Sequence, residues 1–187
     1  MFDNLVSNEI GLVHLIAAIF ALLFGTWVLT ARKGTRAHRR IGYAYAASMI
    51  LLVASAFMIY RLFGRFGVFH VAAIASTVTL SGGMIPVILR RPKNSWLNLH
   101  FNFMFWSVFG LYAAFMAEMA VRLPVRTVFS SPTAFFIMVG VATFSTMIIG
   151  HIIFFKNKKK WEKILTVPHE NAKPSLHLKE LDIKIVD

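Results

Sequence analysis

The sequence predicts an all-α, polytopic membrane protein in which five helices cross the bilayer. Of the 187 residues, 57% are hydrophobic and only 15% are charged, whereas a soluble domain carries about 25% charged residues. Stretches of roughly 18 or more nearly uncharged residues, long enough to span a bilayer, lie at about 10–30, 41–62, 66–89, 97–121 and 133–155. Because only short loops separate them, we expect one transmembrane bundle over residues 1–155, with a four-helix core plus a fifth helix, and a basic cytoplasmic tail over 156–187.

Lysine and arginine side chains predict the orientation. If the N-terminus lies outside, 16 of the 20 basic residues fall on the inner side, including eight lysines after the fifth stretch. Positive charge accumulates on the cytoplasmic side of membrane proteins, so we expect the C-terminus inside. The net charge of +12 then indicates contact with anionic lipid headgroups, strongest at residues 156–163, and not with nucleic acid. The chain has no cysteine, which excludes disulfides and thiolate ligands.

The first two predicted helices each bring one histidine. His14 lies near the outer end of the first, on a face with small residues that ends at Gly25, and such faces let a neighbouring backbone or a flat cofactor approach. Gly34 should end this helix. His38 lies immediately before the second helix, in the basic inner loop.

The next two predicted helices each bring another histidine. His70 lies in the first or second turn of the third helix, which contains Pro86 and a kink that a membrane bundle tolerates. The fourth helix carries His100 near its inner end and Glu118 near its outer end. Eighteen residues correspond to five turns, so both side chains share one face about 27 Å apart. Glu118 equally fits an ion pair with Arg122, four residues on.

Sorted by side, the histidines form two pairs on alternate helices. His14 and His70 belong to the outer side, and His38 and His100 to the inner side, where His151 of the fifth helix is an additional candidate. A bundle core is a usual place for cofactor or metal ligands from facing helices.

Three runs carry a family resemblance: HRRIGYAY at 38–45, GRFGVFH at 64–70 and LHFNFMFWSVFGLYAAFMAE at 99–118. They resemble a family of bacterial multi-pass membrane proteins known as domain of unknown function 2306. The resemblance covers about residues 11–122, without the fifth helix or the tail. The matching positions are His14, His38, His70, His100, Gly25, Gly42 and Arg122. It implies a helical bundle in the bacterial cytoplasmic membrane, and no particular activity.

The favoured function is a di-haem b-type electron carrier, because haem iron accepts two axial histidines. His14 and His70 would hold an outer haem, and His38 and His100 an inner one. Glycines at 25, 42 and 110 would leave room for the porphyrins. Arg39 and Arg40 inside, and Arg61 or Arg65 outside, would pair with the propionates. A redox partner, or a small-molecule or lipid substrate, is not identified by the sequence.

Two alternatives remain open. His14, His70 and Glu118 would form a His2Glu zinc site at the outer surface, making the protein an intramembrane hydrolase, although no HExxH motif and no second buried acid are present. Alternatively, the histidines and Glu118 would serve as a relay in a proton- or ion-coupled transporter, although no inverted repeat is visible. The symmetry of the two histidine pairs favours haem.

Overall fold

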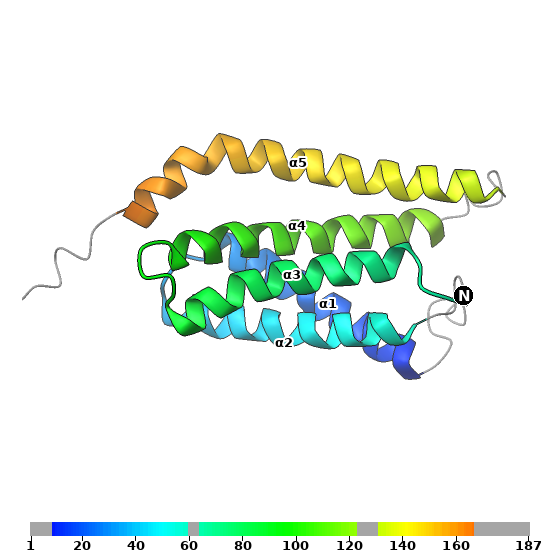
Figure 1. Cartoon of the computed structure of the whole chain (residues 1–187), viewed down its shortest axis with the longest axis horizontal. Coiled ribbons are helices and arrows are strands. Elements are labelled where there is room, and N and C mark those ends of the chain that lie inside the picture. The colour runs from blue at the N-terminus through cyan, green and yellow to red at the C-terminus, as the bar shows by residue number, and fades with distance from the viewer. Residues whose placement is uncertain (1–8, 60–63, 123–130, 167–187) are drawn as a thin grey trace, which may run out of the picture. The chain divides into compact units, whose positions relative to one another are not determined.

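A computed structural model describes residues 9–59, 64–122 and 131–166. These residues form five α-helices and no strand: α1 (Glu9–Thr30), α2 (Arg36–Met58), α3 (Val68–Leu89), α4 (Trp96–Arg122) and α5 (Pro132–Thr166) (Figure 1). Each of the five is long and apolar enough to cross a membrane. The predicted all-α class with five candidate membrane spans is therefore confirmed.

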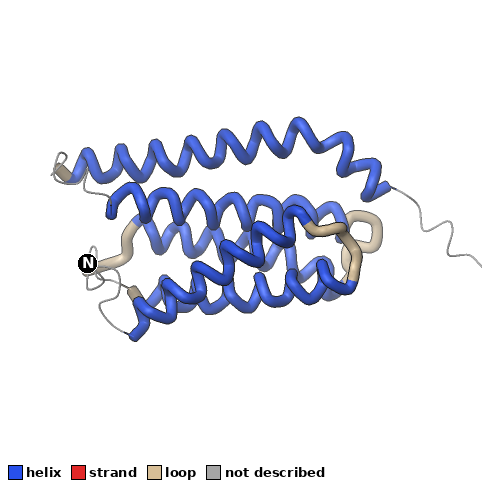
Figure 2. Tube along the Cα trace, turned by 180° about the vertical axis from the view of Figure 1, so that it is seen from behind, coloured by secondary structure: helices blue, strands red, loops and turns tan. Residues whose placement is uncertain are grey.

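The first four helices pack side by side as a bundle in which successive helices run in opposite directions (Figures 1 and 2). Helix α2 packs against α1 and α3, and α4 packs against α3 and α1. Consequently α1 and α3 occupy opposite corners, as do α2 and α4, and the two helices of each diagonal pair run in the same direction. We call the end that carries the α1–α2 and α3–α4 loops the inner end, following the predicted orientation.

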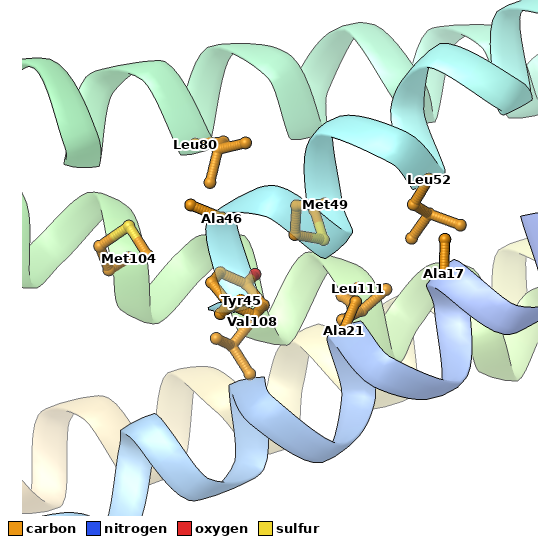
Figure 3. Packing of buried hydrophobic residues seen from close by; sticks show 10 residues of the cluster. All are labelled: Ala17, Ala21, Tyr45, Ala46, Met49, Leu52, Leu80, Met104, Val108 and Leu111. Atoms are coloured by element: carbon orange, nitrogen blue, oxygen red, sulfur yellow. The ribbon is translucent and has the colours of Figure 1, made fainter. Parts of the chain in front are cut away.

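Close packing holds the centre of this bundle, because lipid tails are as apolar as leucine and provide little hydrophobic drive between helices. Tyr45 and Met49 of α2 and Val108 of α4 are fully buried (Figure 3). A Cβ atom added to Gly25 of α1 would lie 3.0 Å from the Tyr45 ring and 3.3 Å from Val108. The space expected for a porphyrin at Gly25 is therefore filled by the Tyr45 ring.

Two helix starts differ from the predicted boundaries, for reasons of capping. Helix α2 begins at Arg36, not at 41, because the Thr35 hydroxyl accepts the backbone N–H of His38 at 3.1 Å, a favourable N-cap. His38, expected before the helix, therefore lies in its first turn. Helix α3 begins at Val68, not at 66, after Gly67.

Helix α5 extends beyond its predicted end at 155 and includes the lysine-rich segment 156–163, since lysine is a good helix former. The chain divides into two compact units, Met1–Ile152 and Ile153–Asp187. In the first unit, Val139 of α5 packs with Ala117 and Val121 of α4. In the second, the Phe154 and Trp161 rings lie 6.0 Å apart. The predicted tail beyond Thr166 lies outside the described residues.

Candidate functional site

The inner histidines, His38 on α2 and His100 on α4, come from diagonally opposite helices that run in the same direction. A hydrogen bond of 2.9 Å between the hydroxyls of Tyr45 and Ser107 joins these helices deeper in the bundle. His38 precedes Tyr45 by seven residues, and His100 precedes Ser107 by seven. Seven residues make close to two turns, or about 10 Å. Both histidines therefore lie on the facing sides at one level, and they are close enough to interact electrostatically.

The imidazole of His100 has the hydrogen bonding typical of a metal-ligating histidine. Its Nδ1 lies 2.8 Å from the carbonyl oxygen of Gly83 on α3. Because a carbonyl only accepts, Nδ1–H is the donor and Nε2 of the neutral ring keeps its lone pair. Ligating histidines usually donate their other ring N–H to a carbonyl or carboxylate in this way, which fixes the ring orientation.

His38 has an unsatisfied polar atom and loose packing one turn away. Its Nδ1 is buried and makes no hydrogen bond to the described part of the chain. Gly42 lies one turn further along α2, and the nearest atom to a Cβ placed there is the Cγ2 of Val28, at 3.9 Å. Of the glycines expected to leave room for a porphyrin, Gly42 thus has a single neighbour at ordinary contact distance, and Gly110 has none within 4 Å.

Lys33 is a cation of this end of the bundle that the sequence pattern did not single out. Its ammonium donates to the carbonyls of Val28, at 2.6 Å, and Leu29, at 2.8 Å, which belong to the last turns of α1. It is close enough to His38 and His100 to interact electrostatically with both. Although much of the side chain is exposed, burial of the ammonium lowers the pKa of Lys33. The sequence signal that could have identified Lys33 is its position just after the first helix, where a lysine side chain can hydrogen-bond to the last carbonyls of that helix.

At the outer end, His14 of α1 bonds to α2. Its Nδ1 lies 3.0 Å from the hydroxyl of Ser55. That hydroxyl donates its proton to the carbonyls of Leu51 and Leu52, at 2.8 and 2.9 Å. Its oxygen therefore accepts from Nδ1–H of His14, which leaves Nε2 of His14 with the lone pair, as in His100.

His70 is arranged differently from the other outer histidine. It is buried, and its Nδ1 accepts the backbone N–H of Gly67 at 3.2 Å, so the proton of the neutral ring lies on Nε2. The ring centroid is 4.9 Å from that of Phe66 and 6.4 Å from that of Phe57. In this arrangement the side chain of His70 caps the start of α3 through Nδ1.

No group of three or more histidine, aspartate or glutamate side chains within residues 9–59, 64–122 and 131–166 is gathered as a metal ion requires. His14, His70 and Glu118 are thus not brought together as a His2Glu set. Glu118 is half-buried on α4, and the side chain of Arg122, its other predicted partner, is outside the described set.

The remaining candidate residues that the structure describes are exposed. Arg39 and Arg40, the predicted propionate partners, are exposed on α2. Arg65 is exposed, and Arg61 is not among the described residues. His151 is exposed on α5, with its ring centroid 6.4 Å from that of Trp106.

Comparison with known proteins adds the family. The profile of one family, described as a predicted membrane protein (DUF2306), matches residues 11–154. The match extends beyond the segment 11–122 in which the sequence runs carry the resemblance, and it includes all α5 residues of the first compact unit. No curated protein and no solved structure gives a significant match. Because the matched segment covers most of the chain, the protein belongs to the DUF2306 family of predicted membrane proteins.

Proposed function

We propose that this protein is a b-type haem redox protein of the membrane whose haem site is the inner pair, His38 and His100. The observation that carries the proposal is the Nδ1–H of His100 bonded to the Gly83 carbonyl at 2.8 Å, which leaves Nε2 for a ligand opposite His38. His38 supports it with a buried, unsatisfied nitrogen and with the loose packing one turn away at Gly42, where an added Cβ would have one neighbour, Val28, at 3.9 Å.

Local charge favours haem over a bare metal ion at this site. The Lys33 ammonium is close enough to both imidazoles to interact with them electrostatically, and it would repel a second cation bound between them. A divalent cation held by two neutral histidines would meet that repulsion, and the acidic side chains described in the bundle, Glu9 and Glu118, lie toward its other end. A haem brings two propionates, whose negative charge compensates the ammonium.

When bound, haem supplies one-electron chemistry at its iron, and the protein supplies ligands, orientation and electrostatics. His38 and His100 would provide the axial nitrogens, and Gly83 would hold the second ring in place. The site lies at one end of the helices, where a redox partner in the aqueous phase could reach it. The protein thus fits an electron carrier or acceptor working at that surface.

The membrane setting of the proposal follows the predicted orientation. With the N-terminus outside and the C-terminus in the cytoplasm of a bacterium, the haem end would face the cytoplasm. Exposed arginines lie at that end, among them Arg32, Arg36, Arg39 and Arg40. Their positive charge suits contact with anionic lipid headgroups.

The proposal departs from the symmetric di-haem hypothesis at the outer end. There His70 uses its Nδ1 as a cap acceptor for Gly67, so the proton of its neutral ring lies on Nε2. An outer haem would require His70 to give up this cap. We therefore expect one haem per chain.

The test is the absorption spectrum of the full chain purified in detergent from haem-replete cells. We expect a Soret band that shifts on dithionite reduction, with one haem per chain. His38→Ala and His100→Ala should each abolish it, whereas His151→Ala, a matched change on α5, should retain it. Colourless wild-type protein would refute the proposal, and one zinc per chain in that sample would favour the hydrolase alternative. Two haems per chain would instead support a second haem site at the outer end, at His14 and His70.

A further inference from the structure

We infer that Lys33 recognises an acidic group of the molecule held between His38 and His100, which for the proposed haem is a propionate carboxylate. This inference rests on the proposed function and assigns a binding residue to the same site.

The ammonium of Lys33 is held in place before any ligand arrives. Two hydrogen bonds, of 2.6 and 2.8 Å, attach it to the carbonyls of Val28 and Leu29. A lysine ammonium has three protons to donate, so one more is available for a ligand. A donor already fixed in position loses less conformational freedom on binding than a mobile side chain does.

The ammonium and Gly42 also have a neighbour in common, Val28. The Val28 carbonyl accepts from Lys33 at 2.6 Å, and its Cγ2 atom would lie 3.9 Å from a Cβ placed at Gly42. Gly42 is one turn from His38 on α2. A flat ligand entering between His38 and His100 would therefore bring its edge toward Lys33.

Arg39 and Arg40 are less suited to this role than the sequence suggested. They follow His38 directly, so their side chains leave α2 about 100° and 200° around the helix from His38. Both are exposed. Long, mobile arginines in such positions serve the headgroup region, whereas Lys33 reaches the site from the end of α1.

The competing explanation is that Lys33 merely caps the C-terminal carbonyls of α1. The two roles predict different results. A cap affects the stability of the bundle whichever ligand is bound, whereas recognition of an acid affects the preference for a carboxylate over its neutral ester.

The experiment titrates the full chain, purified without haem, with ferric haem and with its dimethyl ester, in which both carboxylates are neutral. A hydrogen bond to a charged group corresponds to about tenfold or more in affinity, so wild-type protein should prefer the acid by at least about tenfold. Lys33→Gln should reduce this preference to within about twofold while binding the ester as tightly as wild type does, which verifies its fold. Arg39→Gln is the matched control and should keep the preference.

The outcomes separate this inference from the proposed function. If wild-type protein binds neither porphyrin, both fail. If it binds acid and ester equally, or if Lys33→Gln keeps the preference, haem binding stands and the role of Lys33 is refuted. If Arg39→Gln removes the preference, Arg39 is the recognising residue and the inference is wrong.

Discussion

The hydrogen bond between Tyr45 and Ser107 provides a quantitative test of the bundle. The two side chains are 0% and 1% exposed, and their oxygens lie 2.9 Å apart across the α2–α4 diagonal. Hydrogen bonds between membrane helices contribute about 0.6 kcal/mol on average and up to about 1.7 in double-mutant cycles. Because no water competes at so buried a pair, we expect a coupling free energy of about 1 kcal/mol or more between Tyr45→Phe and Ser107→Ala.

The assay is unfolding of the full chain in mixed micelles of increasing dodecyl sulfate content, followed by circular dichroism, for both single variants and the double variant. Tyr45→Phe alone should cost little more than the coupling, because the Ser107 hydroxyl can then bond a carbonyl one turn back in its own helix. The matched control is Ser48→Ala. Ser48 is also buried, but it donates to the Ala44 carbonyl of its own helix at 2.9 Å, so its coupling to Tyr45→Phe should be close to zero.

A coupling below about 0.3 kcal/mol for Tyr45 and Ser107 would refute the reasoning, since additivity at this level is typical of independent sites. That result would mean that no hydrogen bond between Tyr45 and Ser107 joins α2 to α4. The alignment of His38 with His100, which depends on the seven-residue spacing from that bond, would lose its basis as well.

Two further predictions concern the site. Gly42→Ala places a methyl group 3.9 Å from Val28, an ordinary contact, and should leave the haem-to-protein ratio near one. Gly42→Leu places a larger side chain beside His38 and should reduce that ratio severalfold. If both variants bind as much haem as wild type, the ligand lies elsewhere. His70→Ala removes the acceptor for the Gly67 N–H and should lower the free energy of unfolding by about 1–2 kcal/mol, the cost of a lost cap, without changing the haem content. Loss of half the haem of a two-haem preparation would instead make His70 a ligand.

Several features of this protein follow from the sequence alone. Each membrane span is a local property, because about twenty apolar residues in a row suffice to cross a bilayer, and all five predicted spans are present. The four histidines on alternate helices are also evident in the sequence. Helix ends were less predictable, because single side chains decide them: the Thr35 hydroxyl caps the start of α2, and the His70 imidazole caps the start of α3.

The tertiary structure decided what depends on two helices at once. The spacing from His38 to Tyr45 equals that from His100 to Ser107 in the sequence, but only packing brings Tyr45 opposite Ser107, since the register of one helix against another depends on contacts distant in the chain. Which ring nitrogen of a histidine carries the proton is likewise set by its hydrogen-bond partner on another segment, such as the Gly83 carbonyl for His100. For that reason the sequence suggested two equivalent histidine pairs, whereas in the structure the pairs differ, because Nδ1 of His100 bonds to the Gly83 carbonyl while Nδ1 of His70 accepts from Gly67 and caps α3.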